Sequence, residues 1–550
     1  MRNPNTKTRT SPGNKVVTAA EAVTHIQSNS TLATGGFIGS GFAEGLAIAL
    51  EDRFLGKDST TTKGDPSGLT LIYAGGQGDG ANRGLNHLAH PGLLSCAIGG
   101  HWGLVPKLQK LALSNQIEAY NLPQGVISQL YRDIAAHRPG LITKVGVGTF
   151  VDPRHAGGRL NNCSKRDLVE MLKIDGKEYL LYKTFPIHAC LLRATTSDEH
   201  GNMTMEKEAL TLDTLAIAMA THNSGGIVIV QVERIAKSGS LQSRQVKIPG
   251  ILVDFIVVSE KITDHLQTHS EPYSAVYSGE ILAPNKVVVP SKLDARKIIA
   301  RRAALELRAH DIVNLGVGIP EGIASIAAEE DLVDLMTLTA EPGVVGGLPA
   351  SGLDFGAATN AEAILDQPYQ FDFYDGGGLD IAFLGMAQVD SKGNLDVSLF
   401  NGHLAGAGGF INISQNTKRL VFMGTFSAGN LELEIMDGTL TIRREATVRK
   451  FINQVEQITF NGEDSVARNQ TVIYITERCV FSLTKFGLEL VEIAPGIDLD
   501  RDILKLMDFR PKLAKQIIKM DKRIFREYPM GLRSEIISDH DERKPHTTEK

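Results

Sequence analysis

Gly39-Ser-Gly-Phe-Ala-Glu-Gly45 recurs 277 positions later (316 − 39) as Gly316-Val-Gly-Ile-Pro-Glu-Gly322. In both places a short apolar stretch typical of a buried strand precedes the glycines, and a helical pattern follows them. A helical pattern also precedes each strand, at 18–27 and at 294–309. The chain therefore contains one helix–strand–turn–helix plan twice.

Two further matches follow in the same order. Residues 187–203 match residues 379–395, and both contain a strand pattern followed by a turn of the form Asp-x-x-Gly-Asn. A shorter match pairs Ile248–Asp254 with Ala494–Asp500. Because the order is kept and strands alternate with helical stretches, we expect an α/β protein made by duplication of a whole domain. The prediction is two tandem, internally homologous open α/β/α domains with mainly parallel sheets.

The first copy is longer than the second. The offset between the copies falls from 277 to 192 (390 − 198), so the first copy carries about 85 more residues. These residues are rich in Gly, His and Asn, and added loops on a repeated scaffold often build a site. We expect a linker near 284–291. The predicted organisation is a disordered tail at 1–15, an N-terminal domain at 16–287 that holds the extra loops, a C-terminal domain at 292–530 and a charged tail at 531–550.

The composition is that of a soluble globular protein. Of the 550 residues, 42% are hydrophobic and 22% are charged, and the net charge of −6 comes without a long Lys/Arg run. This balance argues against partners such as nucleic acid or an anionic membrane. No apolar stretch approaches the roughly 20 residues that cross a bilayer, and residues 1–15 lack the apolar core of a secretory signal. The four cysteines form no Cys-x-x-Cys pair, which predicts a reducing, cytoplasmic location without a disulfide framework or structural zinc site.

One carboxylate distinguishes the two copies. The strand pattern that ends at Ala74 continues into Gly75-Gly76, whereas its counterpart ends in Ala340-Glu341-Pro342. Pro342 blocks further strand pairing, so Glu341 stands in a turn at the carboxyl end of a strand, where α/β folds bind ligands. The alternative is an ordinary solvated turn residue. A residue needed for folding should occur in both copies, so the asymmetry favours a chemical role for Glu341.

Three other patterns carry less information. Gly76–Ala81 fits a loose dinucleotide-binding pattern, but no acidic residue ends a following strand, so we do not expect NAD binding. His87, His90 and His101 are close in sequence but lack the carboxylates typical of a metal site, which favours hydrogen bonding or ligand contact. The sequence has no phosphate-loop motif and no nucleophile-elbow motif.

Two glycine-containing segments could polarise a carbonyl group. The amide of Gln124, in a predicted loop between Pro123 and Gly125, could donate to a carbonyl oxygen or be an ordinary turn amide. In Gly406-Ala-Gly-Gly-Phe410 the backbone N–H groups are unshielded by side chains, which suits an oxyanion or an extended cofactor arm. The same glycines would also suit a sharp entry into a strand. The residues alone leave these alternatives open.

Taken in order, the motifs resemble those of family I coenzyme A transferases, most closely the single-chain propionate and acetate CoA-transferases. The resemblance runs from about residue 16 to about residue 529, and only the ordered set of motifs is specific. Pro342 departs from the pattern, because other branches have Asn there, and Phe42-Ala43 stands where Pro often follows the first glycine motif. Neither departure removes a reacting group. The motifs that carry the resemblance are Gly35-Gly-Phe with Gly41, Pro123-Gln-Gly125, Ala340-Glu-Pro-Gly343 and Gly406-Ala-Gly-Gly409.

The resemblance implies roles for four residues. Glu341 takes the nucleophile's position, and Gln124 with Gly408 or Gly409 takes that of the groups that polarise the acyl oxygen. A carboxylate is ionised at neutral pH, so it needs no base to attack a thioester.

The resemblance also implies the reaction and the partners. CoA would move between short-chain acyl-CoA thioesters and free carboxylates such as acetate, propionate and butyrate. The mechanism would be ping-pong, through a glutamyl-CoA thioester, with CoA as a substrate, no permanent cofactor, no metal, and a homo-oligomeric dimer or tetramer. The nearest alternative is an acyl-CoA thioester hydrolase on the same scaffold. An isomerase or deaminase on a related fold and a non-catalytic ligand-binding regulator are more distant alternatives.

Overall fold

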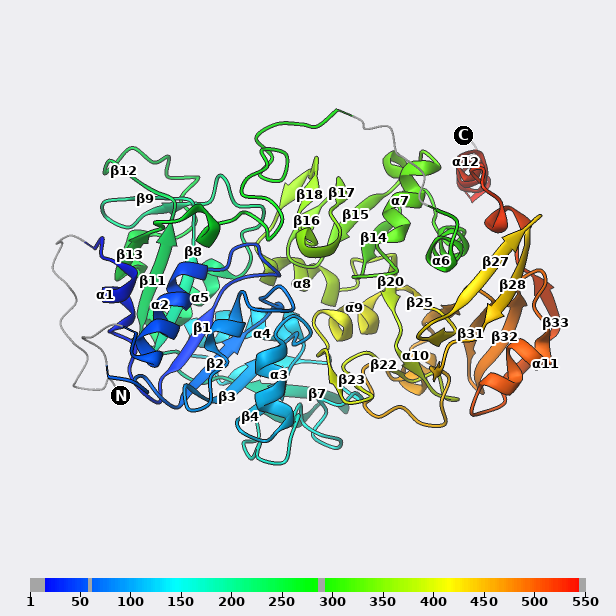
Figure 1. Ribbon diagram of the computed structural model, residues 1–550, viewed down its shortest axis with the longest axis horizontal. Helices are drawn as coiled ribbons and strands as arrows, with labels where there is room; N and C mark the ends of the chain where they lie inside the picture. The colour runs from blue at the N-terminus through cyan, green and yellow to red at the C-terminus, as the bar shows by residue number, and fades with distance from the viewer. Residues whose placement is uncertain (1–14, 58–61, 285–291, 544–550) are drawn as a thin grey trace.

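Figure 1 shows a computed structural model that describes residues 15–57, 62–284 and 292–543. Two α/β domains lie side by side along the longest axis, the first coloured blue to green and the second green to red. Residues 1–14 of the predicted tail at 1–15, most of the predicted linker and residues 544–550 lie outside the described residues.

The N-terminal domain contains a seven-stranded, wholly parallel sheet in the order β13-β11-β8-β1-β2-β3-β4. Central strands such as β8 and β11 are apolar and almost wholly buried, as expected for a sheet covered on both faces. Apolar residues of α1, α2 and α3 pack in the core on one face, and those of α4 and α5 in the core on the other. The bounds are α1 Ala19–Val23, β1 Thr31–Thr34, α2 Glu44–Leu55, β2 Leu69–Tyr73, β3 Leu94–Gly99, α3 Pro106–Leu113, β4 Glu118–Asn121, α4 Gln124–Ala135, β8 Ala189–Arg193, α5 Thr214–Asn223, β11 Ile227–Val232 and β13 Phe255–Val258.

The C-terminal domain contains a ten-stranded sheet in the order β19-β16-β15-β14-β20-β25-β30-β31-β32-β33. Its five central strands, β15 to β30 in this order, are parallel, and antiparallel strands extend both sides. The bounds are α6 Ala295–Ala304, β14 Ile312–Leu315, α7 Gly322–Glu329, β15 Thr337–Ala340, β16 Val344–Val345, β19 Ala363–Ile364, α8 Gln367–Asp375, β20 Ile381–Gly385, α9 Phe410–Asn416, β25 Arg419–Met423, β30 Thr471–Ile475, β31 Cys479–Thr484, β32 Gly487–Ile493 and β33 Lys512–Lys519.

The predicted duplication is confirmed by strand order. The order β2-β1-β8-β11-β13 of the first sheet recurs as β15-β14-β20-β25-β30 in the second. The predicted Asp-x-x-Gly-Asn turns are also built alike. The Asn202 N–H donates to Asp198 Oδ1 (2.9 Å), and the Asn394 N–H donates to Asp390 Oδ1 (3.0 Å). The second match therefore joins equivalent positions.

The third predicted match, between Ile248–Asp254 and Ala494–Asp500, is wrong. Asn202 Oδ1 accepts from the Gly250 N–H (2.9 Å), and the equivalent Asn394 Oδ1 accepts from the Gly462 N–H (3.0 Å). The structural counterpart of Gly250 is therefore Gly462, which lies ahead of β30. The segment Ala494–Asp500 instead follows β32, in the antiparallel extension of the second sheet. The two segments share a short Pro-Gly pattern but occupy different positions in the fold.

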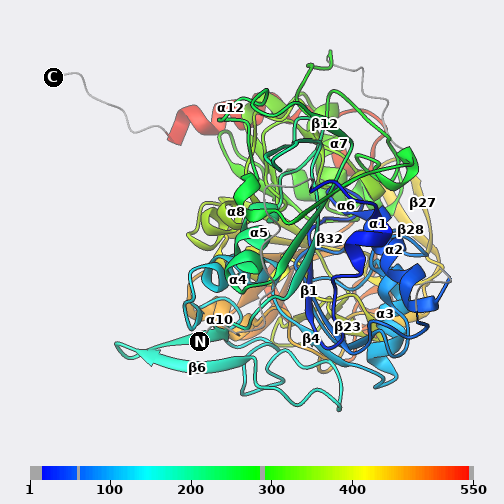
Figure 2. The same cartoon turned by 90° about the vertical axis from the view of Figure 1, so that its left-hand side faces the viewer.

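The extra residues of the first copy serve two purposes. They add β3, α3 and β4 to the parallel domain, ahead of α4, which packs against α8 of the second domain. They also form a small antiparallel sheet whose β6–β7 hairpin projects from the body of the molecule (Figure 2). The sheet consists of β5 Gly140–Thr143, β6 Val169–Ile174 and β7 Lys177–Lys183.

The folded C-terminal domain continues past residue 530, where the sequence was expected to become a charged tail. Helix α12 (Leu532–Arg543) packs Leu532 and Ile536 against the second core. The Glu330 carboxylate accepts from the N–H groups of Gly531 (2.8 Å) and Leu532 (3.1 Å) at the start of this helix. Two apolar residues at i and i+4 are enough to dock an otherwise charged helix. None of the helices described is both long and apolar enough to cross a membrane.

Candidate active site

Glu341 lies in a tight turn at the junction of the two domains. The turn joins β15 to the antiparallel β16, as the predicted strand-then-turn pattern required. Gly343 in this turn has a φ of +128°, and a Cβ there would lie 2.1 Å from the Leu365 carbonyl oxygen. Only glycine fits, so the turn holds Glu341 in one backbone setting.

The Glu341 side chain is not a solvated turn residue, because Glu341 is only 8% exposed. Burial raises the pKa of its carboxyl to about 7, and a hydrogen bond from its own backbone N–H opposes this shift. The expectation of a carboxylate fully ionised at neutral pH therefore needs correction. Protonated and ionised forms coexist near pH 7, and the ionised form has lost much of the hydration that would quench a nucleophile.

The Gly406–Phe410 loop lies directly against Glu341. A Cβ at Gly409 would be 3.4 Å from Glu341 Cγ. The loop leads into helix α9 with Gly409 as its N-cap residue, so these glycines do not form the strand entry that was one of the two open alternatives. The apolar pattern at 410–413 is short enough to suit either element, and here it packs on the second core as a helix.

The structure separates Gly408 from Gly409. The Gly408 N–H donates to the Gly100 carbonyl (2.8 Å), and the Ala407 N–H donates to Asn121 Oδ1 (2.8 Å). The Gly409 N–H has no hydrogen-bond partner within the described part of the chain. Gly409 rather than Gly408 thus presents a free donor beside Glu341.

Gln124 is the first residue of helix α4, not part of a loop, and it is 1% exposed. The first N–H groups of a helix have no partner within it. Here the C-terminal domain supplies the missing acceptors. The Gln124 N–H donates to the Gly408 carbonyl (2.8 Å), and the Gly125 N–H donates to Asn412 Oδ1 (3.2 Å). The structure therefore brings Gln124, Gly408, Gly409 and Glu341 together.

Further hydrogen bonds join the two domains next to this loop. The Ala405 carbonyl accepts from the N–H groups of Trp102 (2.7 Å) and Gly103 (2.9 Å). Together with the bonds of Gly408 and Ala407 they form a cross-domain ladder between 100–124 and 405–408. Because most of its donors and acceptors are backbone atoms, the ladder fixes the position of the loop whatever its side chains.

Sequence reasoning missed Gln367, the first residue of α8. Its Oε1 accepts from Gln124 Nε2 (3.3 Å), and both residues are buried. Helices α4 and α8 precede equivalent strands in the two copies, so Gln124 and Gln367 are related by the repeat. The signal was a Gln beside a Pro in each copy, at Pro123-Gln124 and Gln367-Pro368.

The three histidines have different surroundings. His87 bonds to Glu51 (2.6 Å) and Glu44 (3.1 Å), and His90 bonds to Glu51 (2.6 Å), which confirms the hydrogen-bonding interpretation for these two. His101 lies against the site, where a Cβ at Gly408 would be 3.6 Å from its ring. Burial, and then the charge of His403, lowers the pKa of His101 to about 4, so it is neutral.

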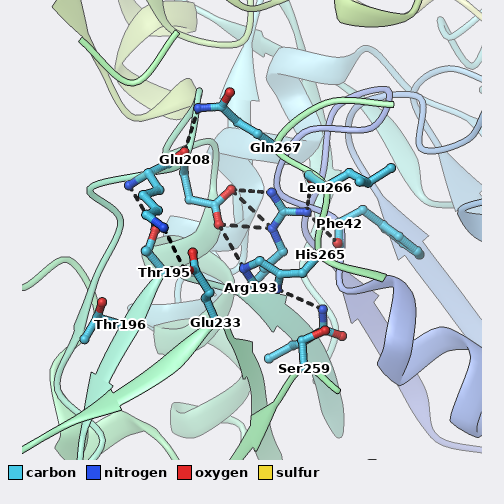
Figure 3. Close-up of polar contacts among 12 residues, drawn as sticks. Phe42, Arg193, Thr195, Thr196, Glu208, Glu233, Ser259, His265, Leu266 and Gln267 are labelled. Carbon is cyan, nitrogen blue, oxygen red and sulfur yellow. Dashed lines mark hydrogen bonds and ion pairs between the residues drawn. The ribbon is translucent and has the colours of Figure 1, made fainter. Parts of the chain in front are cut away.

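The carboxyl edge of the first sheet is occupied by a buried ion pair instead of a free carboxylate (Figure 3). Arg193, at the end of β8, donates to both oxygens of Glu208 through Nε (3.0 Å) and Nη2 (2.6 Å), and both side chains are almost wholly buried. Its Nη1 donates to the carbonyls of Leu266 (2.6 Å) and Phe42 (3.3 Å). The pair thereby secures the loops at this edge of the first domain.

Known proteins share this architecture. Residues 16–259 match the family model for coenzyme A transferase. The chain is 45% identical over 519 residues to the acetate CoA-transferase YdiF of Escherichia coli K12, covering 94% of this chain and 96% of that protein. This chain belongs to the coenzyme A transferase family. The CoA-transferase is also 44% identical over 523 residues to the caffeate CoA-transferase of Acetobacterium woodii, covering 94% and 98%.

A crystal structure of a related protein has the same fold as this CoA-transferase. An acyl-CoA transferase from E. coli O157:H7 in a thioester complex with CoA superposes with a TM-score of 0.88 at 43% identity, covering 96% of this chain and 98% of that one. The expected family, fold class and enzyme class are confirmed. The protein is an enzyme that transfers CoA.

Proposed function

We propose that this CoA-transferase moves CoA between short-chain acyl-CoA thioesters and free carboxylates by a ping-pong mechanism, with Glu341 as the nucleophile. The observation that carries the proposal is a buried, single-copy carboxylate beside the free N–H of Gly409 at the domain junction. The E. coli relative crystallised as a thioester complex with CoA supports a covalent intermediate.

The first half-reaction begins with attack of ionised Glu341 on the thioester carbonyl. The Gly409 N–H and the Gln124 side-chain amide donate to the oxyanion, and such donors typically contribute about 3 to 4 kcal/mol each. CoA leaves as the thiolate, and the acyl group stays on Glu341 as a mixed anhydride. Since the thiolate needs no protonation to leave, the site requires no separate acid.

The thiolate then attacks the glutamyl carbon and expels the free acid, which leaves Glu341 bound to CoA as a thioester. A second carboxylate attacks this thioester, and the same two steps run in reverse to release the new acyl-CoA. Thioester energy is kept throughout, so ATP is not consumed. The intermediates survive only where water is excluded, which the burial of Glu341 favours.

Borohydride trapping tests the intermediate. Borohydride reduces a thioester to an alcohol but leaves a carboxylate untouched. Inactivation should therefore require prior addition of acyl-CoA, and the modified peptide should contain Glu341. Glu341→Gln, of nearly the same shape, should show neither turnover nor trapping. A label on another acid, or inactivation that ignores acyl-CoA, would refute the mechanism.

The preference for short acyl groups is supported by tight apolar packing around Glu341. Its neighbours Ala340 and Val344 belong to a cluster that also contains Phe37 and Phe355, whose ring centroids are 6.1 Å apart. A Cβ at Gly356 would lie only 2.8 Å from the Phe37 ring. The relative named as an acetate CoA-transferase supports the same choice.

An aromatic acyl group is the second candidate, because the caffeate CoA-transferase relative is 44% identical. Acetyl-, propionyl-, butyryl- and caffeoyl-CoA, each with acetate as acceptor (labelled acetate for acetyl-CoA), would separate the two. We expect the highest kcat/KM for the short donors, and a preference for caffeoyl-CoA would overturn this choice. Release of free CoA at the same rate with and without an acceptor acid would identify a thioester hydrolase instead. We also expect a homo-oligomer, which light scattering measures.

A further inference from the structure

The two proposed oxyanion donors come from different domains. Gln124 opens helix α4 of the first domain, and Gly409 caps helix α9 of the second. Each donor is useful only if the other stands at a fixed distance from it. The contact that joins the two helix starts through a side chain is the hydrogen bond from the Gly125 N–H to Asn412 Oδ1 (3.2 Å), next to Gln124 in sequence and three residues after Gly409.

Asn412 can accept from Gly125 only when its amide faces one way. Asp375, the last residue of α8, sets that direction, because its carboxylate oxygens accept from Asn412 Nδ2 at 2.9 and 3.1 Å. An ionised carboxylate offers acceptors only, so the NH2 end of Asn412 must face it and Oδ1 must face Gly125. Gln129 of α4 donates to the same carboxylate (2.9 Å), so Asp375 binds side chains from both domains.

Packing prevents Asn412 from turning round. Asn412 is 0% exposed, and a Cβ at Gly125 would lie 2.6 Å from its Nδ2 and 2.4 Å from the Phe371 ring. The helices therefore touch at van der Waals distance where the amide sits. Burial raises the pKa of the Asp375 carboxyl to about 6, opposed by the hydrogen bonds from Asn412 and Gln129, so the carboxyl is mostly ionised at pH 7.

We propose that Asp375 and Asn412 are positioning residues that hold the Gln124 and Gly409 donors in register across the domain junction. The inference rests on the proposed function and extends it to two residues that need not touch the substrate. Asp375 orients Asn412, Asn412 holds the start of α4 through Gly125, and the start of α4 carries Gln124. A misplacement of about 1 Å at such a site can cost up to about 100-fold in rate.

Kinetics of two variants and a matched control test this assignment. Asn412→Ala removes the acceptor for Gly125, and Asp375→Asn presents an NH2 group to two donors. We expect kcat to fall about 10- to 100-fold in each, with the KM for acyl-CoA changed less than about threefold. The control is Arg132→Gln on α4, which breaks the exposed ion pair with Asp372 across the same interface and leaves both bonds of Gln129 in place. Its kcat should stay within about twofold of the parent enzyme.

A double-variant cycle distinguishes positioning from general support. If Asn412 acts through Gln124, then Asn412→Ala made in a Gln124→Ala background should lower kcat by only a small further factor, about threefold or less. Losses that multiply in full, or a wild-type kcat in both Asn412→Ala and Asp375→Asn, would overturn the inference. If Asn412→Ala strongly lowers the unfolding midpoint, the same double-variant cycle is run with Asp375→Asn in place of Asn412→Ala, and its result decides whether the inference holds. Failure of the proposed function looks different, because Gln124→Ala alone would then retain the parent kcat.

Discussion

Removing the charge of Glu341 should stabilise the protein at high pH. The folded pKa of about 7 lies well above the ordinary value of 4.5 for a glutamic acid, so the folded state keeps a proton that the unfolded state releases. Stability is then full below about pH 4.5, falls as the pH rises towards 7, and stays lowered above pH 7. The interval of about 2.5 pKa units corresponds to about 3 kcal/mol, because each unit is 1.36 kcal/mol. The Glu341→Gln side chain has nearly the same shape but does not ionise.

Urea unfolding of both proteins at pH 5, 6.5 and 8 measures this difference. We expect Glu341→Gln to be more stable than the parent by about 3 kcal/mol at pH 8 and by about 1 kcal/mol or less at pH 5. Glu463→Gln is a suitable control for the Glu-to-Gln substitution itself, because the Glu463 side chain is 68% exposed. Parallel pH curves for the parent and Glu341→Gln, or a less stable variant at pH 8, would refute the buried-carboxyl argument.

Three further predictions concern activity and the first domain. The kcat/KM for acyl-CoA should rise with pH and level off above about pH 7, because Glu341, the proposed nucleophile, would attack only when ionised. A profile flat from pH 5 to 9 would contradict this. Gln124→Ala should lower kcat about 10²- to 10³-fold. Because Gln124 is buried, the variant should also lose about 1 kcal/mol in the free energy of unfolding, measured by chemical denaturation. A kcat equal to that of the parent would leave Gln124 with a structural role only. Glu208→Leu strands the buried Arg193 and should cost about 3 to 5 kcal/mol, whereas Glu233→Gln at a half-exposed pair should cost under about 1 kcal/mol; equal losses would be the unexpected result.

The repeated domain and Glu341 could be predicted because both depend on local sequence. Strand, turn and helix patterns recur in order, and a carboxylate present in one copy stands out against the glycine of the other. The boundaries of the repeat were harder. Ala494–Asp500 was matched on a short Pro-Gly pattern, since the true counterpart of Gly250 is recognisable only from the bonds that Asn202 and Asn394 make.

The surroundings of the site could not be predicted, because distant segments create them. Gln124 and Gly409 stand in glycine-rich stretches that resemble loops, yet each begins a helix. The first turn of α4 is completed by Gly408 and Asn412, more than 280 residues away in sequence. The raised pKa of Glu341 likewise follows from burial by segments of both domains, and no pattern around residue 341 indicates it.

The cross-domain ladder between 100–124 and 405–408 has a consequence for how the polypeptide could be divided. Its bonds join the two halves independently of the covalent link, and the link adds a high mutual concentration. Two separately made fragments, cut within 285–291, would therefore be expected to reassociate and recover CoA transfer. On the proposed mechanism neither fragment should be active alone, since one would carry Gln124 without Glu341 and the other Glu341 without Gln124. Such a pair would form a complementation system in which turnover reports the meeting of the two fragments.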